Sequence, residues 1–223
     1  MKRVMTRELL DTDSGTPREI AASLNDLRLI NRWFGGISTT ANLISRVAGK
    51  THAASLSLLE VAAGSGYVST IVQERLQNRG LKLQILLLDR AASHLSNGNR
   101  AVVGDALALP FRDESCDLVC CNLFVHHLAP RELVHFVDEA LRVCRTAVLI
   151  DDIIRHPVHL SLVYASLPIY RSRMTRHDAP ASVRQAYTPD EMRKLLVETR
   201  AARVEISRHY LFRMGIIAWK SDA

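Results

Sequence analysis

The chain has 223 residues, 48% of them hydrophobic and 23% charged, and its 29 Lys and Arg outnumber its 23 Asp and Glu to give a net charge of +6. This length suits one domain with an elaboration or two small domains, and the composition excludes wholesale disorder. No apolar run approaches the roughly 18 residues that cross a bilayer, and the N-terminus has no apolar signal-peptide core. We therefore expect a cytoplasmic protein without a membrane partner.

Neither the charge pattern nor the cysteines point to a special class of protein. Basic residues are scattered and aromatic residues make up only 5%, whereas a nucleic-acid-binding protein usually concentrates both on one stripe. We expect a small molecule, and not nucleic acid, as the partner. Cys116, Cys120, Cys121 and Cys144 include no CxxC pair. This spacing favours buried free thiols, and we expect no metal site or disulfide framework.

The first 50 residues are expected to form a helical cap. Residues 1–15 look loosely held. Residues 16–19, Thr-Pro-Arg-Glu, combine an N-cap threonine, a proline at the first helical position and a glutamate three residues after the cap, which is typical of a helix start. Gly35 and Gly36 end this helix, and a second helix is expected over 38–47.

From residue 56 onward, apolar strands alternate with helices. The expected strands cover residues 56–61, 83–88, 101–103, 116–121, 146–150, 203–210 and 214–219. The expected helices cover residues 67–78, 91–95, 130–142 and a segment that begins near 188. Near-continuous apolar strands joined by helices predict a doubly wound, Rossmann-like α/β fold with a mostly parallel seven-stranded sheet. The short connection between the last two strands predicts an antiparallel strand at the sheet edge.

An insertion over residues 156–187 separates the fifth strand from the last helix. It begins with an apolar stretch, residues 160–170, and continues with a polar stretch, residues 171–180. Because ligands bind beyond the carboxyl ends of the strands in an open α/β sheet, an insertion at this point is well placed to be a helical lid.

The strongest chemical signal is the turn after the first strand, residues 60–66, Glu-Val-Ala-Ala-Gly-Ser-Gly. Its glycines let the backbone turn sharply and approach a ligand closely. No Gly-Lys-Ser/Thr follows, and Ser69 stands where a dinucleotide fingerprint has its third glycine. The carboxylate of Glu60 would repel a pyrophosphate and would instead favour a cation.

Two further carboxylates follow the next two strands. Asp89 ends the second strand and can accept hydrogen bonds from both hydroxyls of a ribose. Asp105, after the third strand, can accept one from an adenine amino group. Three carboxylates at successive strand ends would be costly to bury without a partner. They indicate a nucleoside that carries a positive centre.

These residues carry a resemblance to the class I S-adenosylmethionine-dependent methyltransferases, in particular to the group of the ubiquinone and menaquinone biosynthesis methyltransferases. It rests on four blocks: residues 58–66, residues 88–90, residues 104–111 (Gly-Asp-Ala, then Leu-Pro-Phe) and residues 124–128 (Phe-Val-His-His-Leu). The order and spacing of the blocks cover residues 56–150. The common turn of this family has glycine where this chain has Ala62.

The resemblance implies S-adenosylmethionine as the cofactor and a methyltransferase domain over 51–223 that follows the cap. It implies that Glu60, Ala62 and Gly64 line the methionine part, with Asn122 and Leu123 closing that side, and that Asp89 binds the ribose. The adenine would be held by the residues around the second and third strand ends, Arg90, Gly104, Asp105 and Ala106. The cap would fold over the cofactor at Arg32.

The acceptor is inferred from chemistry and position. Residues 28–32 and 175–184 resemble uncharacterised bacterial methyltransferases of polyketide or phenolic-lipid pathways. Transfer from a sulfonium is a direct displacement, so alignment and exclusion of water supply most of the rate. An imidazole suits a phenol as base, and the candidates are His127 and His177. Tyr170, Arg173 and His177 are expected to bind the substrate.

Other interpretations stay open at this point. A carbon of a quinol ring could be the acceptor, or the chain could be a non-catalytic, cofactor-binding module. RNA methylation is disfavoured, because residues 122–125, Asn-Leu-Phe-Val, lack the Asn-Pro-Pro-Tyr-like pattern. Asp105 could simply cap a turn, one imidazole of the 126–127 pair could be packed and hydrogen-bonded, and His177 could be a solvated loop residue.

Overall fold

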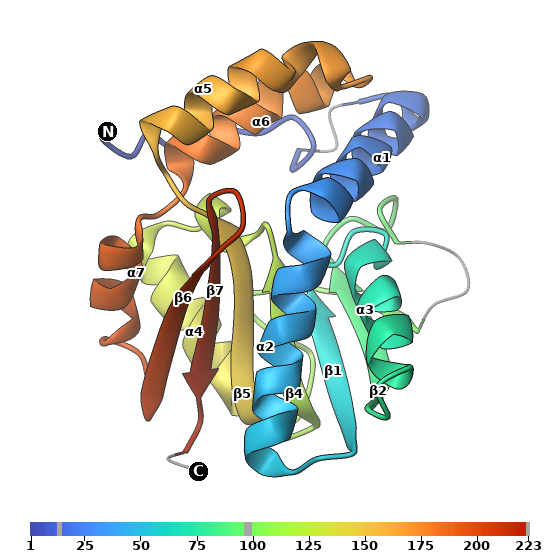
Figure 1. The fold of residues 1–223 in the computed structure, drawn as a ribbon, viewed down its shortest axis with the longest axis vertical. Helices are drawn as coiled ribbons and strands as arrows, with labels where there is room; N and C mark the ends of the chain where they lie inside the picture. Colours follow the sequence, from blue (N-terminus) through green and yellow to red (C-terminus); the bar gives the residue numbers. More distant parts are fainter. Residues whose placement is uncertain (13–14, 96–99, 222–223) are drawn as a thin grey trace.

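The computed structural model describes residues 1–12, 15–95 and 100–221 and contains one seven-stranded sheet in the order β3-β2-β1-β4-β5-β7-β6 (Figure 1). The strands are β1 (Ser55–Val61), β2 (Lys82–Asp89), β3 (Ala101–Val103), β4 (Cys116–Asn122), β5 (Cys144–Ile153), β6 (Arg203–His209) and β7 (Arg213–Trp219). β7 runs antiparallel to both β5 and β6, and the other neighbouring pairs are parallel. The predicted α/β class is confirmed. β7, the strand that runs antiparallel to its neighbours, lies one position in from the sheet edge and pairs with the edge strand β6.

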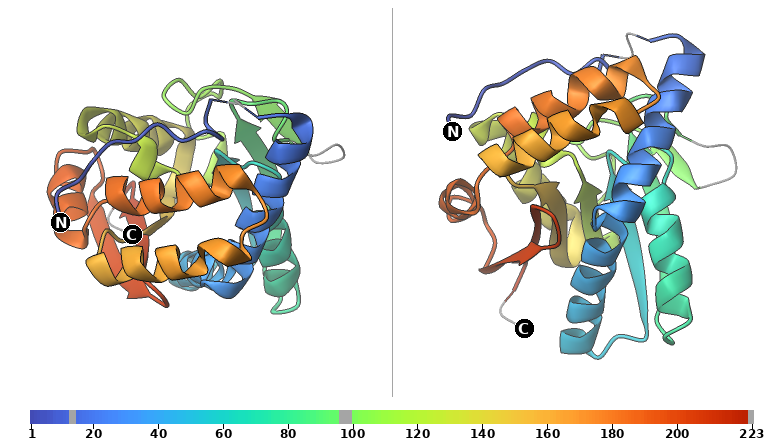
Figure 2. Two further views of the ribbon diagram at one scale, coloured as in Figure 1. Left: turned by 90° about the horizontal axis from the view of Figure 1, so that it is seen from above. Right: turned by 45° about the horizontal axis from the view of Figure 1, so that its top comes forward.

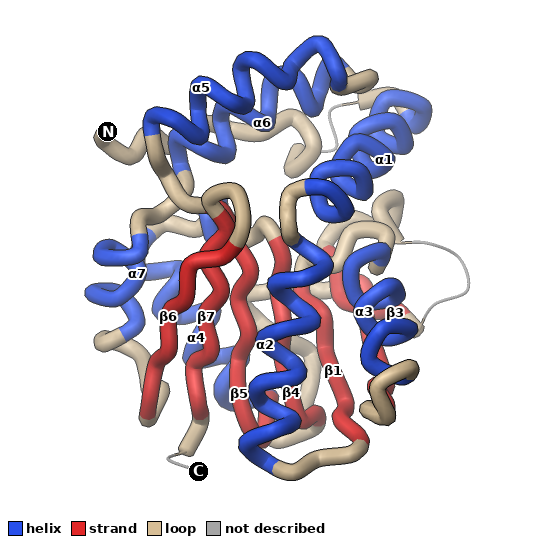
Figure 3. The backbone as a smooth tube through the Cα atoms, in the orientation of Figure 1, coloured by secondary structure: helices blue, strands red, loops and turns tan. Residues whose placement is uncertain are grey.

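Helices cover both faces of the sheet, as the tube in Figure 3 shows. The helices are α1 (Pro17–Trp33), α2 (Gly36–Thr51), α3 (Tyr67–Gln77), α4 (Pro130–Val143), α5 (Pro157–Ser166), α6 (Arg173–Gln185) and α7 (Pro189–Leu196), with short 3-10 turns η1 (Val125–His127) and η2 (Leu167–Ile169). One apolar core lies between the sheet and α2 and α3, and the other lies between the sheet and α4 and α7. Neighbouring strand residues such as Leu58 and Leu59 enter opposite cores, as the two-residue period of a strand requires.

Capping explains where the helices begin. Thr16 accepts a hydrogen bond from the Glu19 backbone N–H while the Glu19 carboxylate accepts one from the Thr16 backbone N–H, and Thr188 and Glu191 repeat this box at α7. The expected helix over 91–95 is wrong, because the structure has a turn there. Asp89 accepts a hydrogen bond from the Ala91 N–H, so the chain bends at the end of β2.

A second layer lies above the carboxyl ends of the strands and consists of α1, α5, α6 and residues 1–12 (Figure 2). α2, although it falls within the expected cap of residues 1–50, packs on the sheet. The expectation that residues 1–15 are loosely held is wrong for the part that the structure describes. The Val4 N–H donates to the Arg184 carbonyl, and Glu8 is 7% exposed.

A buried ion pair joins this second layer to the sheet. The Arg213 guanidinium, 1% exposed, donates from Nη1 to Asp151 Oδ1 at 3.0 Å and from Nη2 to Asn31 Oδ1 at 2.7 Å. Gly36 lies against the same group, and a Cβ on it would stand 2.2 Å from Asn31 Oδ1. The α1–α2 connection is therefore held against β5 and β7 by polar contacts that leave no room for a side chain at residue 36.

Within the described residues, no helix is long and apolar enough to cross a membrane.

Replacing Arg213 by Met should lower the free energy of unfolding by about 3–5 kcal/mol, because it leaves the Asp151 carboxylate buried without its cation. Urea denaturation of the purified variant measures this loss. Arg193→Met is the matched control, since Arg193 pairs with Asp190 at the surface and such pairs contribute only about 0–1 kcal/mol. Equal, small losses in the two variants would contradict the account.

Candidate functional site

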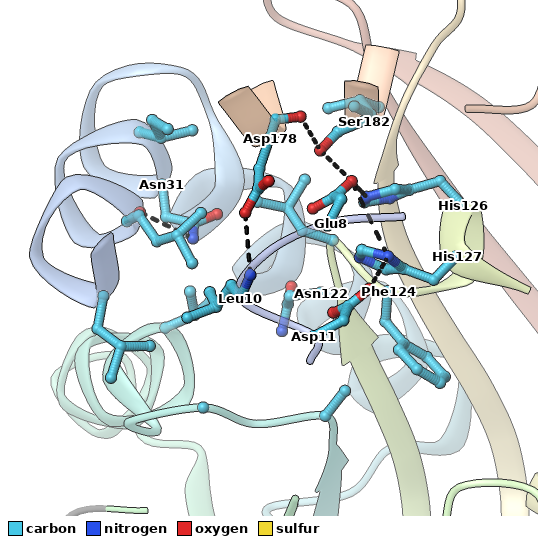
Figure 4. Close-up of a pocket in the computed structure, with 18 of the residues that line it drawn as sticks. Glu8, Leu10, Asp11, Asn31, Asn122, Phe124, His126, His127, Asp178 and Ser182 are labelled. Atoms are coloured by element: carbon cyan, nitrogen blue, oxygen red, sulfur yellow. Dashed lines mark hydrogen bonds and ion pairs between the residues drawn. The ribbon is translucent and has the colours of Figure 1, made fainter. Parts of the chain in front are cut away.

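The carboxyl ends of the strands and the second layer enclose a cavity of about 690 Å³ (Figure 4). Its floor is formed by the ends of β1, β2 and β4, and its roof by α1, α5, α6 and the N-terminal segment. This position is the one expected for a ligand in an open α/β sheet. Its size is within the usual range for small-molecule sites.

The turn after β1 forms one wall of the cavity. Glu60 is 2% exposed, accepts from Asn122 Nδ2 at 2.7 Å and from the Ser69 hydroxyl, and its burial raises its pKa to about 7. Ala62 has φ +53° and Gly64 also has φ +53°. Alanine is strained in this left-handed region, which explains why glycine is the commoner residue at the position of Ala62. A Cβ on Gly64 would meet only Leu24, at 3.8 Å, so this backbone is open to the cavity.

The two aspartates have different partners. Asp89 accepts from the backbone N–H of Gly64 at 2.8 Å and of Ala91 at 3.0 Å. Burial acts to raise its pKa, but these bonds and the nearby His94 lower it overall. Asp105 accepts from the Leu107 N–H at 2.9 Å, so it caps a turn, as one interpretation held, and also lines the cavity.

The cavity brings together most of the residues that the sequence singled out. Of the expected cofactor residues it is lined by Glu60, Ala62, Gly64, Asp89, Arg90, Gly104, Asp105, Ala106, Asn122 and Leu123. His127 and Tyr170, expected at the reaction centre and at the acceptor, line it too.

Three of the expected site residues do not line the cavity. Arg32 lies over the Trp33 ring, 5.9 Å from its centroid. Arg173 is paired with Glu19 on the outer side of the second layer. His177, with a side chain 48% exposed, has its Nδ1 2.7 Å from Asp178 Oδ1. α6 turns its Asp178 inward and its His177 outward, which does not support the catalytic and substrate-binding roles expected of His177. The pairing of Arg173 with Glu19 likewise does not support its expected role in substrate binding.

The adjacent histidines have separate environments. His126 is 2% exposed, and its Nδ1 lies 2.7 Å from Asp152 Oδ1. Burial acts to lower the pKa of His126, but Asp152 and Glu8 outweigh it and raise the pKa to about 10. His127 lines the cavity, and its Nδ1 lies 2.7 Å from Asp11 Oδ2. One imidazole is thus packed and hydrogen-bonded, while the other faces the cavity.

Sequence reasoning missed the contribution of the N-terminal segment. The buried carboxylate of Glu8 accepts from Ser182 Oγ and Gln185 Nε2, each at 2.6 Å. Asp178 accepts from the backbone N–H groups of Leu9 and Leu10. These partners are about 170 residues apart in the chain, so no local pattern could have revealed the pairing.

Glu8, His126 and His127 also bring three potential metal-ligating atoms within 4.8 Å of one another. Ser182 and Gln185 both donate to Oε1 of the Glu8 carboxylate. Asp152 likewise holds the His126 ring. Glu8 and His126 therefore already have hydrogen-bond partners within the chain.

Comparisons with known proteins agree with this geometry. Residues 59–149 match a family model described as a methyltransferase domain. The chain has a methyltransferase fold. No curated protein matches the sequence. S-adenosylmethionine is the cofactor of the family whose model matches, which agrees with the cofactor expected here. The narrower resemblance to the ubiquinone and menaquinone group stays a prediction.

Solved structures share the fold at low sequence identity. An O-methyltransferase family 2 protein from Planctomyces limnophilus DSM 3776, in complex with apigenin, is 18% identical with a TM-score of 0.61, covering 92% of this chain and 62% of its own. A protein of Methanococcus maripaludis assigned to the S-adenosyl-L-methionine-dependent methyltransferases is 13% identical, with a TM-score of 0.59 and coverage of 94% and 96%. Magnesium protoporphyrin IX methyltransferase from Synechocystis PCC 6803, with bound SAH, is 14% identical, with a TM-score of 0.54 and coverage of 84% of both chains.

Stability should fall as pH rises through the range in which Glu60 ionises. The pKa of Glu60 is raised from 4.5 to about 7 in the folded chain, so the folded state binds the extra proton between these values. The cost of burying the charge is absent below pH 4.5 and complete above pH 7, and it amounts to roughly 3 kcal/mol.

Urea denaturation of wild type and Glu60→Gln across this range measures the effect as a difference between two curves. The wild type should lose stability relative to Glu60→Gln as pH rises. Glu74→Gln is the control, because Glu74 is exposed on α3, and its free energy of unfolding should change with pH as that of the wild type does. If the stability of Glu60→Gln changed with pH in the same way as that of the wild type, the claim that Glu60 is a buried carboxylate with a raised pKa would be refuted.

Proposed function

We propose that this protein transfers the methyl group of S-adenosylmethionine to a hydroxyl oxygen of a small aromatic acceptor of phenolic or polyketide type. The observation that carries the proposal is that one cavity joins a wall of carboxylates at the strand ends to an apolar chamber under the second layer. His127 lines the cavity at the end of β4. The family match and the fold support the transfer, and the polarity of the cavity supports the acceptor class.

The carboxylates at the strand ends suit an adenosyl sulfonium. Glu60 supplies a carboxylate beside the open backbone of Gly64, where the methionine part would lie. Asp89 would accept from the ribose hydroxyls, and Asp105 and the Ala106 N–H would hold the adenine. When bound, S-adenosylmethionine supplies a methyl group on a positively charged sulfur, which anionic side chains stabilise.

The acceptor chamber is largely apolar and aromatic. It is lined by Leu27, Ile30, Phe124, Leu162, Val163, Tyr170, Val183 and Phe212. Such walls bury a flat ring and exclude water from the reacting atoms, which aligns the acceptor and protects the sulfonium. The size and largely apolar lining of the chamber favour a small molecule over a protein or RNA acceptor.

His127 is the proposed proton acceptor. Its Nδ1 is held by Asp11, which leaves Nε2 as the nitrogen that can take the proton of an acceptor hydroxyl. Asp11 fixes the ring orientation in the way that a carboxylate orients a catalytic imidazole. Removing the proton as the carbon–oxygen bond forms is expected to contribute about 10²–10⁴ to the rate.

Asp89→Asn should weaken binding of S-adenosylmethionine and of S-adenosylhomocysteine by at least about tenfold, because each hydrogen bond to a charged carboxylate contributes about 1.5–3 kcal/mol. Isothermal titration calorimetry measures both constants. Asp190→Asn, whose side chain is 87% exposed on α7, should leave them unchanged. Undiminished affinity in a folded Asp89→Asn variant would remove Asp89 from the cofactor site.

His127→Ala should lower single-turnover methyl transfer to a phenol by about 10²–10⁴ while leaving the affinity for S-adenosylhomocysteine intact. His177→Ala is the control and should react like the wild type. A panel of phenols, with mass spectrometry of the product, identifies the acceptor and the methylated atom.

Three results would go against the proposal. A full rate in His127→Ala would exclude this residue as base. Methylation at a ring carbon would favour the quinol alternative. Cofactor binding without turnover of any phenol would favour a non-catalytic module.

A further inference from the structure

The roof of the cavity carries an unusual helix. α5 contains no buried residue, and residues 157–170 contain no Asp, Glu, Lys or Arg. Val158 is 52% exposed, and Ile169, just after α5, is 71% exposed. Soluble proteins seldom leave a contiguous apolar stretch of this kind uncovered, and such patches mark interaction sites.

The side chains of α5 are divided between two sides. His159, Leu162, Val163 and Ser166 line the cavity, and Leu162 is also 48% exposed. Val158 and Ala165, seven residues apart and therefore on one helix face, are exposed. α5 thus separates the acceptor chamber from the solvent by the thickness of one helix.

The N-terminal segment and α6 extend the same surface, because all three lie side by side in the view from above (Figure 2). The Val4 N–H donates to the Arg184 carbonyl at 3.1 Å, and the Arg184 guanidinium bonds to the Tyr164 hydroxyl of α5. Met1, Val4 and Met5 are each about half exposed. We call residues 1–7 and 157–169, with the exposed arginines 171, 173 and 176, the cap surface.

The charge of the cap surface is of one sign. Its exposed charged residues are Lys2, Arg7, Arg171, Arg173 and Arg176. The acidic groups of this region are buried or paired, and the surface pair with Glu19 occupies Arg173. Glu8 and Asp178 are buried, and Glu19 pairs with Arg173. Asp11 pairs with His127 at the cavity.

We propose that the cap surface docks on an anionic lipid bilayer surface, with the apolar side chains of α5 and of the N-terminal segment in the headgroup region and the arginines and Lys2 on lipid phosphates. An apolar stripe flanked by basic residues is the pattern of interfacial binding. An acidic protein is the alternative partner, but it would need basic groups at the centre of the cap surface. That centre is aliphatic and uncharged. This peripheral contact departs from the expectation of no membrane partner.

Docking in this orientation places α5 between the lipid and the acceptor chamber. An apolar phenol dissolved in the bilayer would then reach the chamber without crossing water, a consequence that rests on the proposed function. The docking itself does not, because it needs neither cofactor nor acceptor.

Sedimentation with vesicles tests the proposal. The full chain is mixed with vesicles of phosphatidylcholine alone or with a quarter of phosphatidylglycerol, and the bound fraction is measured at low and high salt. We expect at least about tenfold tighter binding to the anionic vesicles, weakened by salt. Ile169→Glu should abolish most of it, and Arg171→Ser should weaken it by about fivefold.

Matched controls separate this surface from the rest of the molecule. Val197→Glu changes a residue that is 77% exposed at the end of α7, and Arg75→Ser removes an exposed charge on α3; both should bind like the wild type. Equal binding to neutral and anionic vesicles, equal losses in Val197→Glu and Ile169→Glu, or binding to an acidic carrier protein and not to vesicles would each overturn the proposal. Ile169→Glu should retain full affinity for S-adenosylhomocysteine, so a failure of docking is distinguishable from a failure of the proposed function.

Discussion

The buried carboxylate of Asp151 is the point on which the arrangement of the two layers depends. Its Oδ1 accepts from Arg213, and its Oδ2 lies 3.1 Å from the Thr40 hydroxyl, which also lies 2.6 Å from Asn122 Oδ1. Asn122 in turn donates to Glu60. A continuous polar chain therefore runs from the α1–α2 connection, through the ends of β5 and β4, to the carboxylate at the cavity wall. Removing any member of this chain leaves its neighbour with an unsatisfied buried polar group. The position of the second layer and the orientation of Glu60 are therefore coupled.

Two carboxylates that end adjacent strands have opposite pKa shifts because their donors differ. Glu60 is enclosed with a hydroxyl and an amide, and burial dominates. Asp89 is also buried, yet two backbone N–H groups and His94 favour its charged form. A cation entering the cavity would therefore meet one carboxylate that is already charged and another that ionises at a cost. Burying the positive sulfur next to Glu60 would offset that cost, since an opposite charge at short range favours the ionised carboxylate.

Much of the fold and of the cofactor wall follows from local patterns in the sequence. Apolar runs ending in Glu60, Asp89 and Asp105 set both the strand positions and the carboxylates, because parallel strands bring their ends to one edge. The roof does not follow from such patterns. Ser182 donates to Glu8, and the Leu9 N–H donates to Asp178, across nearly the whole length of the chain. His177 and Asp178 differ in orientation only through the rotation of α6, which a polar helix does not reveal by periodicity. The helix predicted over 91–95 fails for a similar reason. Asp89, at the end of β2, accepts a hydrogen bond from the Ala91 N–H, and this contact bends the chain into a turn.

The two parts of the roof are anchored by different forces. The N-terminal segment is fixed by charged groups with buried partners: Arg3 donates to the carbonyls of Gln185, His126 and Leu128, and Glu8 accepts from α6. Opening it would expose several such groups at once and leave Asp11 unable to hold His127. α5, in contrast, buries no residue fully and is held by its cavity-facing side chains and by contacts with α6. The cost of displacing α5 is therefore mainly the apolar contact that an incoming aromatic ring would itself restore. The proposed apolar acceptor would therefore meet the least resistance under α5, whereas the polar side of the roof holds His127, the proposed base, in place.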